Sequence, residues 1–159
     1  MIENIPASRG SYVLVGKLKK DCTLKIGSLG EFSLNPGYYF YCGNARGRGG
    51  LRSRIGHHCT MEKKIHWHID YFAQNIFWKS VFWCADESVN ECCLIKTFNS
   101  IKEVTHPIKG FGASDCKNGC TSHLCYSSSY LYPQSLIQRN LRSGVLLHQT
   151  SLARNLIES

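Results

Sequence analysis

Residues 11–18 read SYVLVGKL, a run that is rich in β-branched and aromatic residues and is almost entirely apolar. Such residues favour extended backbone, and an apolar run without polar alternation indicates a strand that is buried on both faces. Residues 38–42 (YYFYC) and 76–84 (IFWKSVFWC) have the same aromatic and β-branched character. These three segments predict the strands of a small central sheet.

Shorter patterns surround these strands. Residues 22–34 alternate apolar and polar on either side of a Ser-Leu-Gly break, which predicts a hairpin between the first two strands. Apolar residues recur at helical spacing in 51–59 and, after Asn90 as an N-cap, in 91–104. The sequence therefore predicts a mixed α+β domain in which helices flank the sheet. The Leu-rich residues 133–159 have weak periodicity, and we expect a helical or flexible C-terminal appendage there.

Length and composition limit the class of protein. A chain of 159 residues is long enough for one domain with a hydrophobic core. Its net charge of +8 favours an anionic partner such as nucleic acid, although many soluble proteins are basic without such a partner. It contains no spanning apolar run and no signal peptide, so we expect no membrane and a cytoplasmic or, in a eukaryote, nuclear location. The nine cysteines should then be reduced unless a metal binds them.

Basic residues are concentrated between residues 43 and 64. The glycine-rich loop GNARGRGG leads into a basic helix, an arrangement that suits phosphate because exposed N–H groups and guanidinium groups bind oxyanions. An ordinary solvated basic face is the alternative interpretation. The predicted nucleic-acid contacts are Arg46, Arg48, Arg52, Lys63 and Lys64.

In the two predicted helices, three polar residues lie on the same helical face as the apolar core positions. Arg54 and His58 lie one turn apart beside the apolar stripe of the first helix. Glu91 is aligned with the apolar stripe of the second helix, where a carboxylate needs a cation, a metal ion or the helix dipole. The alternative is a first-turn glutamate that is satisfied by backbone N–H groups.

Several ordered motifs together resemble the GIY-YIG nuclease superfamily. They are Gly10-Ser11-Tyr12, Tyr41-Cys42-Gly43-Asn44-Ala45, Gly50-Leu51 followed by Arg54 and His58, and a helix that opens at Glu91. The longer runs at 39–45, 66–71, 110–116 and 122–124 are similar to its Uri-type branch, an uncharacterised domain found alone or fused to a base-excision endonuclease. The resemblance covers about residues 9–126, which we take as the domain.

The resemblance implies a metal-dependent endonuclease that hydrolyses phosphodiester bonds in DNA. The processes that it suggests for such an enzyme are DNA repair and DNA processing. It assigns Tyr12, Tyr41, Arg54 and His58 to catalysis and makes Glu91 the ligand of one Mg²⁺ or Mn²⁺. The alternative is a nucleic-acid-binding domain on the same scaffold that cuts weakly or not at all. The oligomeric state stays open.

A histidine-rich run lies between the two helices. In a strand, His66, His68 and Asp70 would face one side and could bind a metal ion or phosphate. In a helix they would scatter, and an aromatic-lined packing motif is the interpretation that we favour.

A second cluster has nearly the spacing of a zinc site. Cys116, Cys120 and His123 supply three ligands, and the neighbours that could supply a fourth are Cys125 and Asp115. A structural Zn²⁺ is thus an open alternative.

Overall fold

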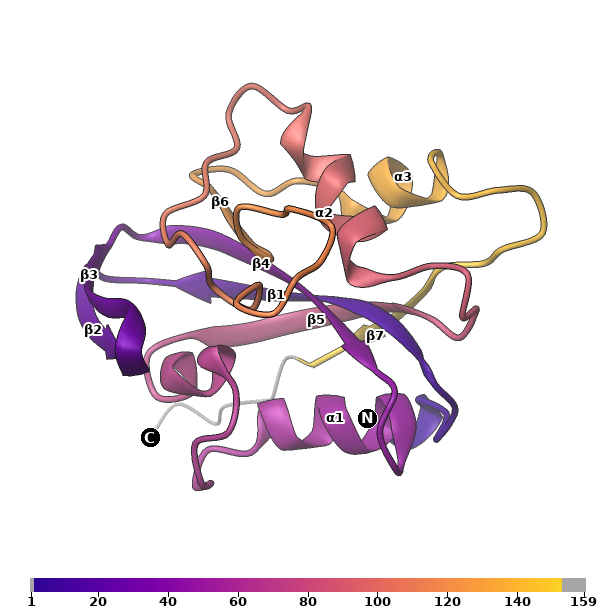
Figure 1. The fold of residues 1–159 in the computed structure, drawn as a ribbon, viewed down its shortest axis with the longest axis horizontal. Coiled ribbons are helices and arrows are strands. Elements are labelled where there is room, and N and C mark those ends of the chain that lie inside the picture. The colour runs from indigo at the N-terminus through magenta and orange to yellow at the C-terminus, as the bar shows by residue number, and fades with distance from the viewer. Residues whose placement is uncertain (1, 153–159) are drawn as a thin grey trace.

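The protein is described by a computed structural model over residues 2–152, and its centre is a five-stranded antiparallel sheet (Figure 1). The strands are β1 (Gly10–Leu18), β4 (Gly37–Ala45), β5 (Phe77–Cys84), β6 (Leu124–Ser127) and β7 (His148–Ser151), arranged in the order β6-β4-β1-β5-β7. β1 lies in the middle and pairs with both β4 and β5, so its side chains are buried on both faces as predicted.

The segment between β1 and β4 forms a separate hairpin. β2 (Cys22–Ile26) and β3 (Gly30–Leu34) pair antiparallel, and the 3-10 turn η2 (Gly27–Leu29) connects them at the predicted break. The hairpin extends from one end of the main sheet, where β2 contacts the 3-10 helix η3 (His68–Phe72). The predicted extra hairpin is confirmed.

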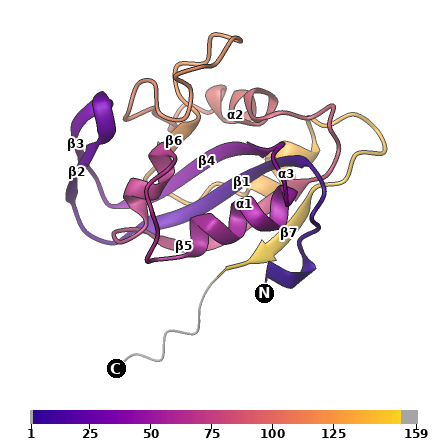
Figure 2. The same cartoon turned by 60° about the horizontal axis from the view of Figure 1, so that its bottom comes forward.

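The two longer helices cover opposite faces of the sheet, as Figure 2 shows. α1 (Gly50–Cys59) packs against the face that carries Tyr12 and Leu14, whereas α2 (Glu91–Asn99) packs against the face of Val13 and Val15. Alternate residues of β1 thus enter two separate cores, as the period of a strand requires. These layers confirm the predicted mixed α+β fold. None of the helices within residues 2–152 is long and apolar enough to span a membrane.

Residues 133–152 belong to the domain and do not form an appendage. The short helix α3 (Pro133–Gln138) contacts α2, and β7 adds an edge strand beside β5. The indole Nε1 of Trp83 donates a hydrogen bond to Thr150 Oγ1 at 3.1 Å. Residues 153–159 of the expected appendage lie outside the described residues.

The start of α1 is anchored by the N-terminal segment, which begins with the 3-10 helix η1 (Ile2–Asn4). The N–H of Leu51 donates to the carbonyl of Ser8 at 2.9 Å. Gly50 has a left-handed φ of 59°, and a Cβ at this position would collide with the carbonyl oxygens of Ala7 and Ser8. Only glycine permits this approach.

We predict that Gly50→Ala lowers the free energy of unfolding by more than about 3 kcal/mol, because it adds a steric collision to an unfavourable φ. Urea denaturation measures the loss. The matched control is Gly144→Ala, where φ is 87° but nothing lies within 4 Å of the new Cβ. The control should lose only about 1 kcal/mol. Equal losses would show that the close backbone approach has no energetic importance.

Candidate functional site

A cavity of about 460 Å³ opens between the end of β4, the start of α2, the helix α1 and the 110–123 segment. Three of the five residues predicted for catalysis and metal binding by the nuclease resemblance line it, namely Tyr41, Arg54 and Glu91. Each comes from a different element, so the fold brings them together from positions far apart in sequence. Tyr12 and His58 do not line this cavity and lie in the layer beneath Tyr41.

Arg54 is held in a fixed orientation. Its Nη1 donates to the carbonyl of Asn44 at 2.9 Å, and its guanidinium lies 4.1 Å from the centre of the Trp67 ring. The positive charge of Arg54 also acts on the Tyr12 hydroxyl, whose pKa it lowers against the larger effect of burial. A cation that is stacked on an aromatic ring and oriented by a carbonyl oxygen can bind an anion at the cavity wall.

Tyr12 and His58 form a buried polar chain with Asp70. The Tyr12 hydroxyl is 2.7 Å from His58 Nε2, and His58 Nδ1 lies 3.5 Å from Asp70 Oδ1, at the outer limit of a hydrogen bond. Burial raises the pKa of Tyr12 and lowers the pKa of His58 to about 4. His58 is therefore neutral at pH 7, with its proton on Nδ1 facing the carboxylate and Nε2 accepting from Tyr12.

The Asp70 carboxylate is the centre of this network. It accepts hydrogen bonds from the backbone N–H groups of His66 and Trp67, both at 2.9 Å, and from His57 Nε2 at 3.1 Å. Although burial by itself raises the pKa of Asp70, the hydrogen bonds from His58, Trp67 and His66 hold it well below its usual value. Asp70 is thus an ionised structural group.

His66, His68 and Asp70 do not form one site. Asp70 Oδ2 accepts three hydrogen bonds, while the His66 ring packs on Trp67 and His68 Nδ1 accepts the N–H of Gly112 at 2.9 Å. The three side chains thus have different partners. The packing interpretation is the one that this geometry supports.

Glu91 is the first residue of α2 and is not its cap. Asn90 occupies the cap position, where its side chain accepts the N–H of Cys93 at 2.9 Å. Glu91 Oε2 is buried and has no hydrogen-bond partner within residues 2–152. The glutamate is therefore not satisfied by backbone N–H groups through this oxygen, and a carboxylate oxygen in that position favours a cation.

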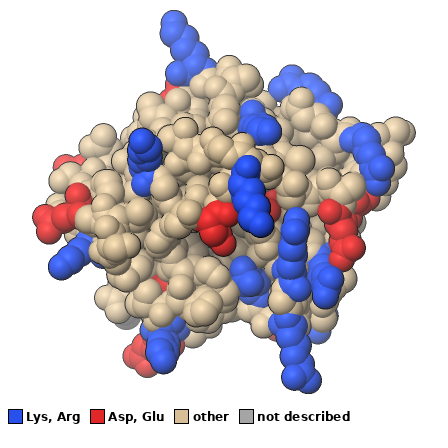
Figure 3. Space-filling model, in the orientation of Figure 1, with Lys and Arg blue, Asp and Glu red and all other residues tan. Residues whose placement is uncertain are grey.

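The predicted phosphate contacts separate into two groups. Arg46 lines the cavity, and Arg48 lies beside Arg54 and Trp67 in an adjoining smaller hollow. Figure 3 shows Lys and Arg side chains gathered at the lower right, over the loop before α1. Lys64 is exposed.

Lys63 and Arg52 are engaged elsewhere. The side chain of Lys63 is 5% exposed, and its Nζ lies 3.3 Å from Asp70 Oδ1 and donates to two carbonyls of α1. Arg52 Nε donates to the carbonyl of Ile5 at 2.7 Å. We therefore leave Lys63 out of the phosphate surface and assign Arg52 first to anchoring the N-terminus.

Two backbone donors where the glycine-rich loop enters α1 are already paired. The N–H of Gly50 donates to the carbonyl of Gly47 at 3.2 Å, and the N–H of Leu51 is taken by Ser8. Phosphate binding by these N–H groups is excluded because they are already paired. The side chains of Arg46 and Arg48 are cationic groups of this loop that line the two hollows.

Four metal-ligating side chains form a cluster beside this cavity. They are Cys92, Cys116, Cys120 and His123, whose ligand atoms are all within 4.8 Å of one another, and all except Cys120 line the cavity. This set could hold a metal ion, and its sulfur content suits zinc better than Mg²⁺ or Mn²⁺. The sequence analysis missed Cys92. The neighbour Cys125 lies in β6, where it is buried opposite Phe40.

The thiol of Cys116 is the most acidic of this cluster. Burial alone would raise its pKa, but hydrogen bonds from the backbone N–H groups of Cys120 and Asn118 and from the side chain of Cys92 lower the pKa of Cys116 to about 6. A thiol that ionises readily is a good metal ligand because the thiolate is the binding form.

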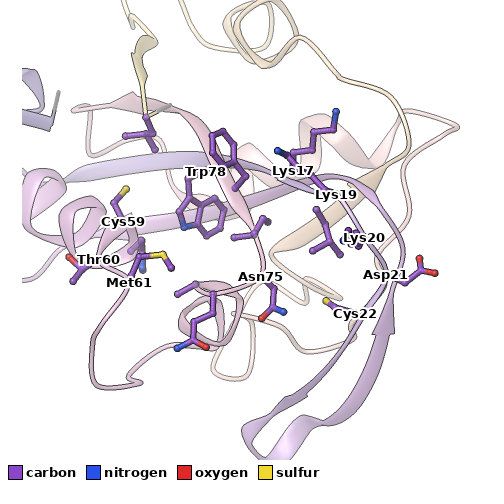
Figure 4. Close-up of a pocket in the computed structure, with 17 residues that line it drawn as sticks. Lys17, Lys19, Lys20, Asp21, Cys22, Cys59, Thr60, Met61, Asn75 and Trp78 are labelled. Carbon is purple, nitrogen blue, oxygen red and sulfur yellow. The ribbon is translucent and has the colours of Figure 1, made fainter. Parts of the chain in front are cut away.

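A second cavity, of about 620 Å³, lies at the other end of α1 and is mostly apolar (Figure 4). Its wall includes Trp78, Met61 and Leu152, the last described residue. Of the predicted site residues it includes only His58. This cavity therefore has no part in the candidate site.

A family model described as "Domain of unknown function DUF123" matches residues 11–145. The chain belongs to the DUF123 family. Comparisons with curated proteins and with solved structures gave no match. The DUF123 match overturns the assignment to the GIY-YIG superfamily and its Uri-type branch. The described residues of this chain carry a cluster of three cysteines and one histidine instead. Any role of its residues must therefore be argued from their geometry.

The buried His58 makes the stability of this DUF123 protein dependent on pH. Its pKa is about 6.5 when unfolded and about 4 when folded, so the unfolded state binds the extra proton between these values. The stability that depends on a neutral His58 should be complete above pH 6.5. Below that, the free energy of unfolding should fall toward pH 4, by up to about 1.4 kcal/mol per pH unit.

Urea denaturation between pH 7 and pH 4 measures this slope. His58→Gln removes the titrating group and should flatten the curve, while His148→Gln, an exposed histidine stacked on Trp83, should leave it unchanged. Partial burial also lowers the pKa of His68, so the difference between wild type and His58→Gln is the quantity to compare. Identical slopes would contradict the assignment.

Proposed function

We propose that this DUF123 protein is a metal-dependent endonuclease that hydrolyses phosphodiester bonds in DNA. One observation carries the proposal: a phenol, a guanidinium and a carboxylate with a buried, unpartnered oxygen line one cavity, contributed by Tyr41, Arg54 and Glu91. Together they form the constellation that phosphoryl chemistry requires, with groups for charge neutralisation, orientation and metal binding.

Glu91 is the group that would bind the metal ion. Mg²⁺ or Mn²⁺ suits a single carboxylate because these hard cations keep water and phosphate oxygens as their other ligands. Such an ion supplies a Lewis acid and lowers the pKa of a bound water. Without a cation, a carboxylate beside phosphates would repel them, so Glu91 argues for a metal in any complex with DNA.

The remaining side chains have distinct roles in this proposal. Arg54 stabilises negative charge on the phosphoryl oxygens. Burial raises the pKa of Tyr41, outweighing the opposing effect of Arg54, so its phenol stays protonated. In this proposal the phenol donates a hydrogen bond to a phosphoryl oxygen. Tyr12 and His58 are fully buried and act as positioning residues beneath Arg54 and Tyr41.

DNA is the substrate that the charge distribution favours. Arg46 and Lys117 line the cavity with Arg54, and Arg48 extends the basic surface along the loop before α1. A backbone that carries one phosphate per nucleotide can contact several of these cations at once. The net charge of +8 has the same sign.

A second candidate is a DNA-binding domain that does not cut. Its support is the complete burial of Tyr12 and His58, two of the four residues expected to act in catalysis. Both candidates bind DNA through the same cations, so cleavage separates them.

We predict that Glu91→Gln reduces Mg²⁺-dependent cleavage by at least about 100-fold, because it removes the charge that holds the metal ion. DNA affinity should be unchanged or higher, since a repulsive carboxylate is lost. The assay uses single-stranded, duplex, flap and branched DNA with Mg²⁺, Mn²⁺ or EDTA. Mn²⁺ binding, followed by electron paramagnetic resonance, provides a readout that does not depend on cleavage.

Glu103→Gln is the matched control, since Glu103 is exposed and does not line the cavity. It should retain cleavage and Mn²⁺ binding. If the folded wild type cuts none of these substrates with either metal but still binds DNA, the binding domain is the correct candidate.

We also predict that DNA affinity falls steeply with salt and that Arg46→Ala and Arg48→Ala each reduce the slope of log K against log salt by about 0.9 on duplex DNA. Each substitution removes one phosphate contact and the counterion release that accompanies it. Fluorescence anisotropy at several salt concentrations measures the slopes. Lys25→Ala, in the β2–β3 hairpin, is the control and should keep the wild-type slope. A wild-type affinity indifferent to salt would contradict a phosphate-dominated interface.

A further inference from the structure

The geometry of the cysteine cluster fits a tetrahedral metal ion. Cys92 Sγ lies 3.5 Å from Cys116 Sγ and 3.6 Å from His123 Nε2. With Zn–S about 2.3 Å and Zn–N about 2.0 Å, a regular tetrahedron separates two sulfurs by about 3.8 Å and a sulfur from a nitrogen by about 3.5 Å. The two sulfurs are too far apart for a disulfide, which needs about 2.05 Å.

The neighbours of the cluster orient its ligands. His123 Nδ1 is 2.9 Å from the carbonyl of Gly112, so Nδ1 carries the proton and Nε2 presents its lone pair to the other ligands. The side-chain amide of Asn118 donates to Cys92 Sγ at 3.4 Å. Second-shell bonds of this kind fix the tautomer of a metal-binding histidine and support the charge of a thiolate.

The cluster joins two parts of the chain that are distant in sequence. Cys92 lies in the first turn of α2, whereas the other three ligands lie in the 110–123 segment, which contains no helix or strand. That segment also supplies Asp115 and Lys117 to the wall of the cavity. A link at this point fixes the segment against α2.

We propose that Cys92, Cys116, Cys120 and His123 bind a structural Zn²⁺ that fastens the 110–123 segment to α2. Four protein ligands close the coordination sphere, so this ion holds the structure and does not activate water. Its position next to Glu91 means that it also sets the first turn of α2 at the cavity. Only this last consequence rests on the proposed function; the zinc site itself does not.

Metal analysis of the purified, reduced protein tests the site. The wild type should contain one zinc per chain, and Cys92→Ser should lose most of it. Cys93→Ser is the matched control, because Cys93 is the adjacent, exposed cysteine of the same helix and should leave the zinc in place. Replacement by Co²⁺ should give the intense visible bands of a tetrahedral site and the near-ultraviolet charge transfer of thiolate ligands.

Two further measurements keep the test decisive if Cys92→Ser does not fold. His123→Cys replaces a nitrogen ligand by a sulfur ligand and should retain the metal with stronger thiolate charge transfer. Removing zinc from the wild type with a strong chelator should increase amide hydrogen exchange in residues 110–123 and in the first turn of α2, while β1 and β4 stay protected.

The zinc proposal is overturned if the folded wild type takes up neither zinc nor Co²⁺ with its thiols reduced, or if metal removal leaves exchange in residues 110–123 unchanged. These results are independent of DNA. A protein that binds zinc but never cuts would refute only the nuclease, whereas a zinc-free protein that cuts with Mg²⁺ would refute only the zinc site.

Discussion

The rest of the domain depends on one buried carboxylate, Asp70, and on the groups that satisfy it. Burying an ionised carboxylate costs several kcal/mol unless hydrogen bonds and opposite charge compensate for it. The groups that face Asp70 come from α1 and from the 63–67 segment, so the buried charge holds these two segments against η3, which contains Asp70. Through His58 the same network reaches Tyr12 on the central strand. Tyr12 in turn contacts Arg54, which links the core to the cavity.

The cavity lies at the end of β4, where residues from α1 on one face of the sheet and α2 on the other both reach it. Successive residues of that strand point to opposite faces, so Tyr41 joins the α1 core and Cys42 joins the α2 core. The apolar stripe of α2 fixes the rotation of the helix and turns Glu91 toward the end of the sheet. A change in helix register would move the carboxylate out of the cavity. The position of this polar site is therefore set by apolar packing on both sides.

The sequence predicts those features whose cause is local. Strand and helix periodicity identify the central sheet, the hairpin and both long helices, and helical spacing places Arg54 and His58 on one face. Other features depend on long-range contacts. Cys92 is 24 residues from Cys116 and shows no motif spacing with it, while β7 reads HQTS and has no apolar alternation because it is an edge strand. The burial of Lys63 also depends on a partner that its local sequence does not reveal, namely Asp70. The superfamily resemblance rested on short motifs, and the DUF123 match over residues 11–145 overturns it.

Two adjacent residues at the start of α2 present opposite metal chemistry. Glu91 offers a hard carboxylate oxygen to the cavity, while Cys92 offers a soft sulfur to the cysteine cluster. Hard Mg²⁺ or Mn²⁺ prefers oxygen, and zinc prefers thiolate and imidazole, so the two proposed sites would select different ions from the same solution. The softer, closed site would hold its ion more tightly and would order the first turn before the oxygen site is filled. If both proposals hold, separate ligands keep the two ions independent, because a shared ligand would couple the loss of one ion to the loss of the other.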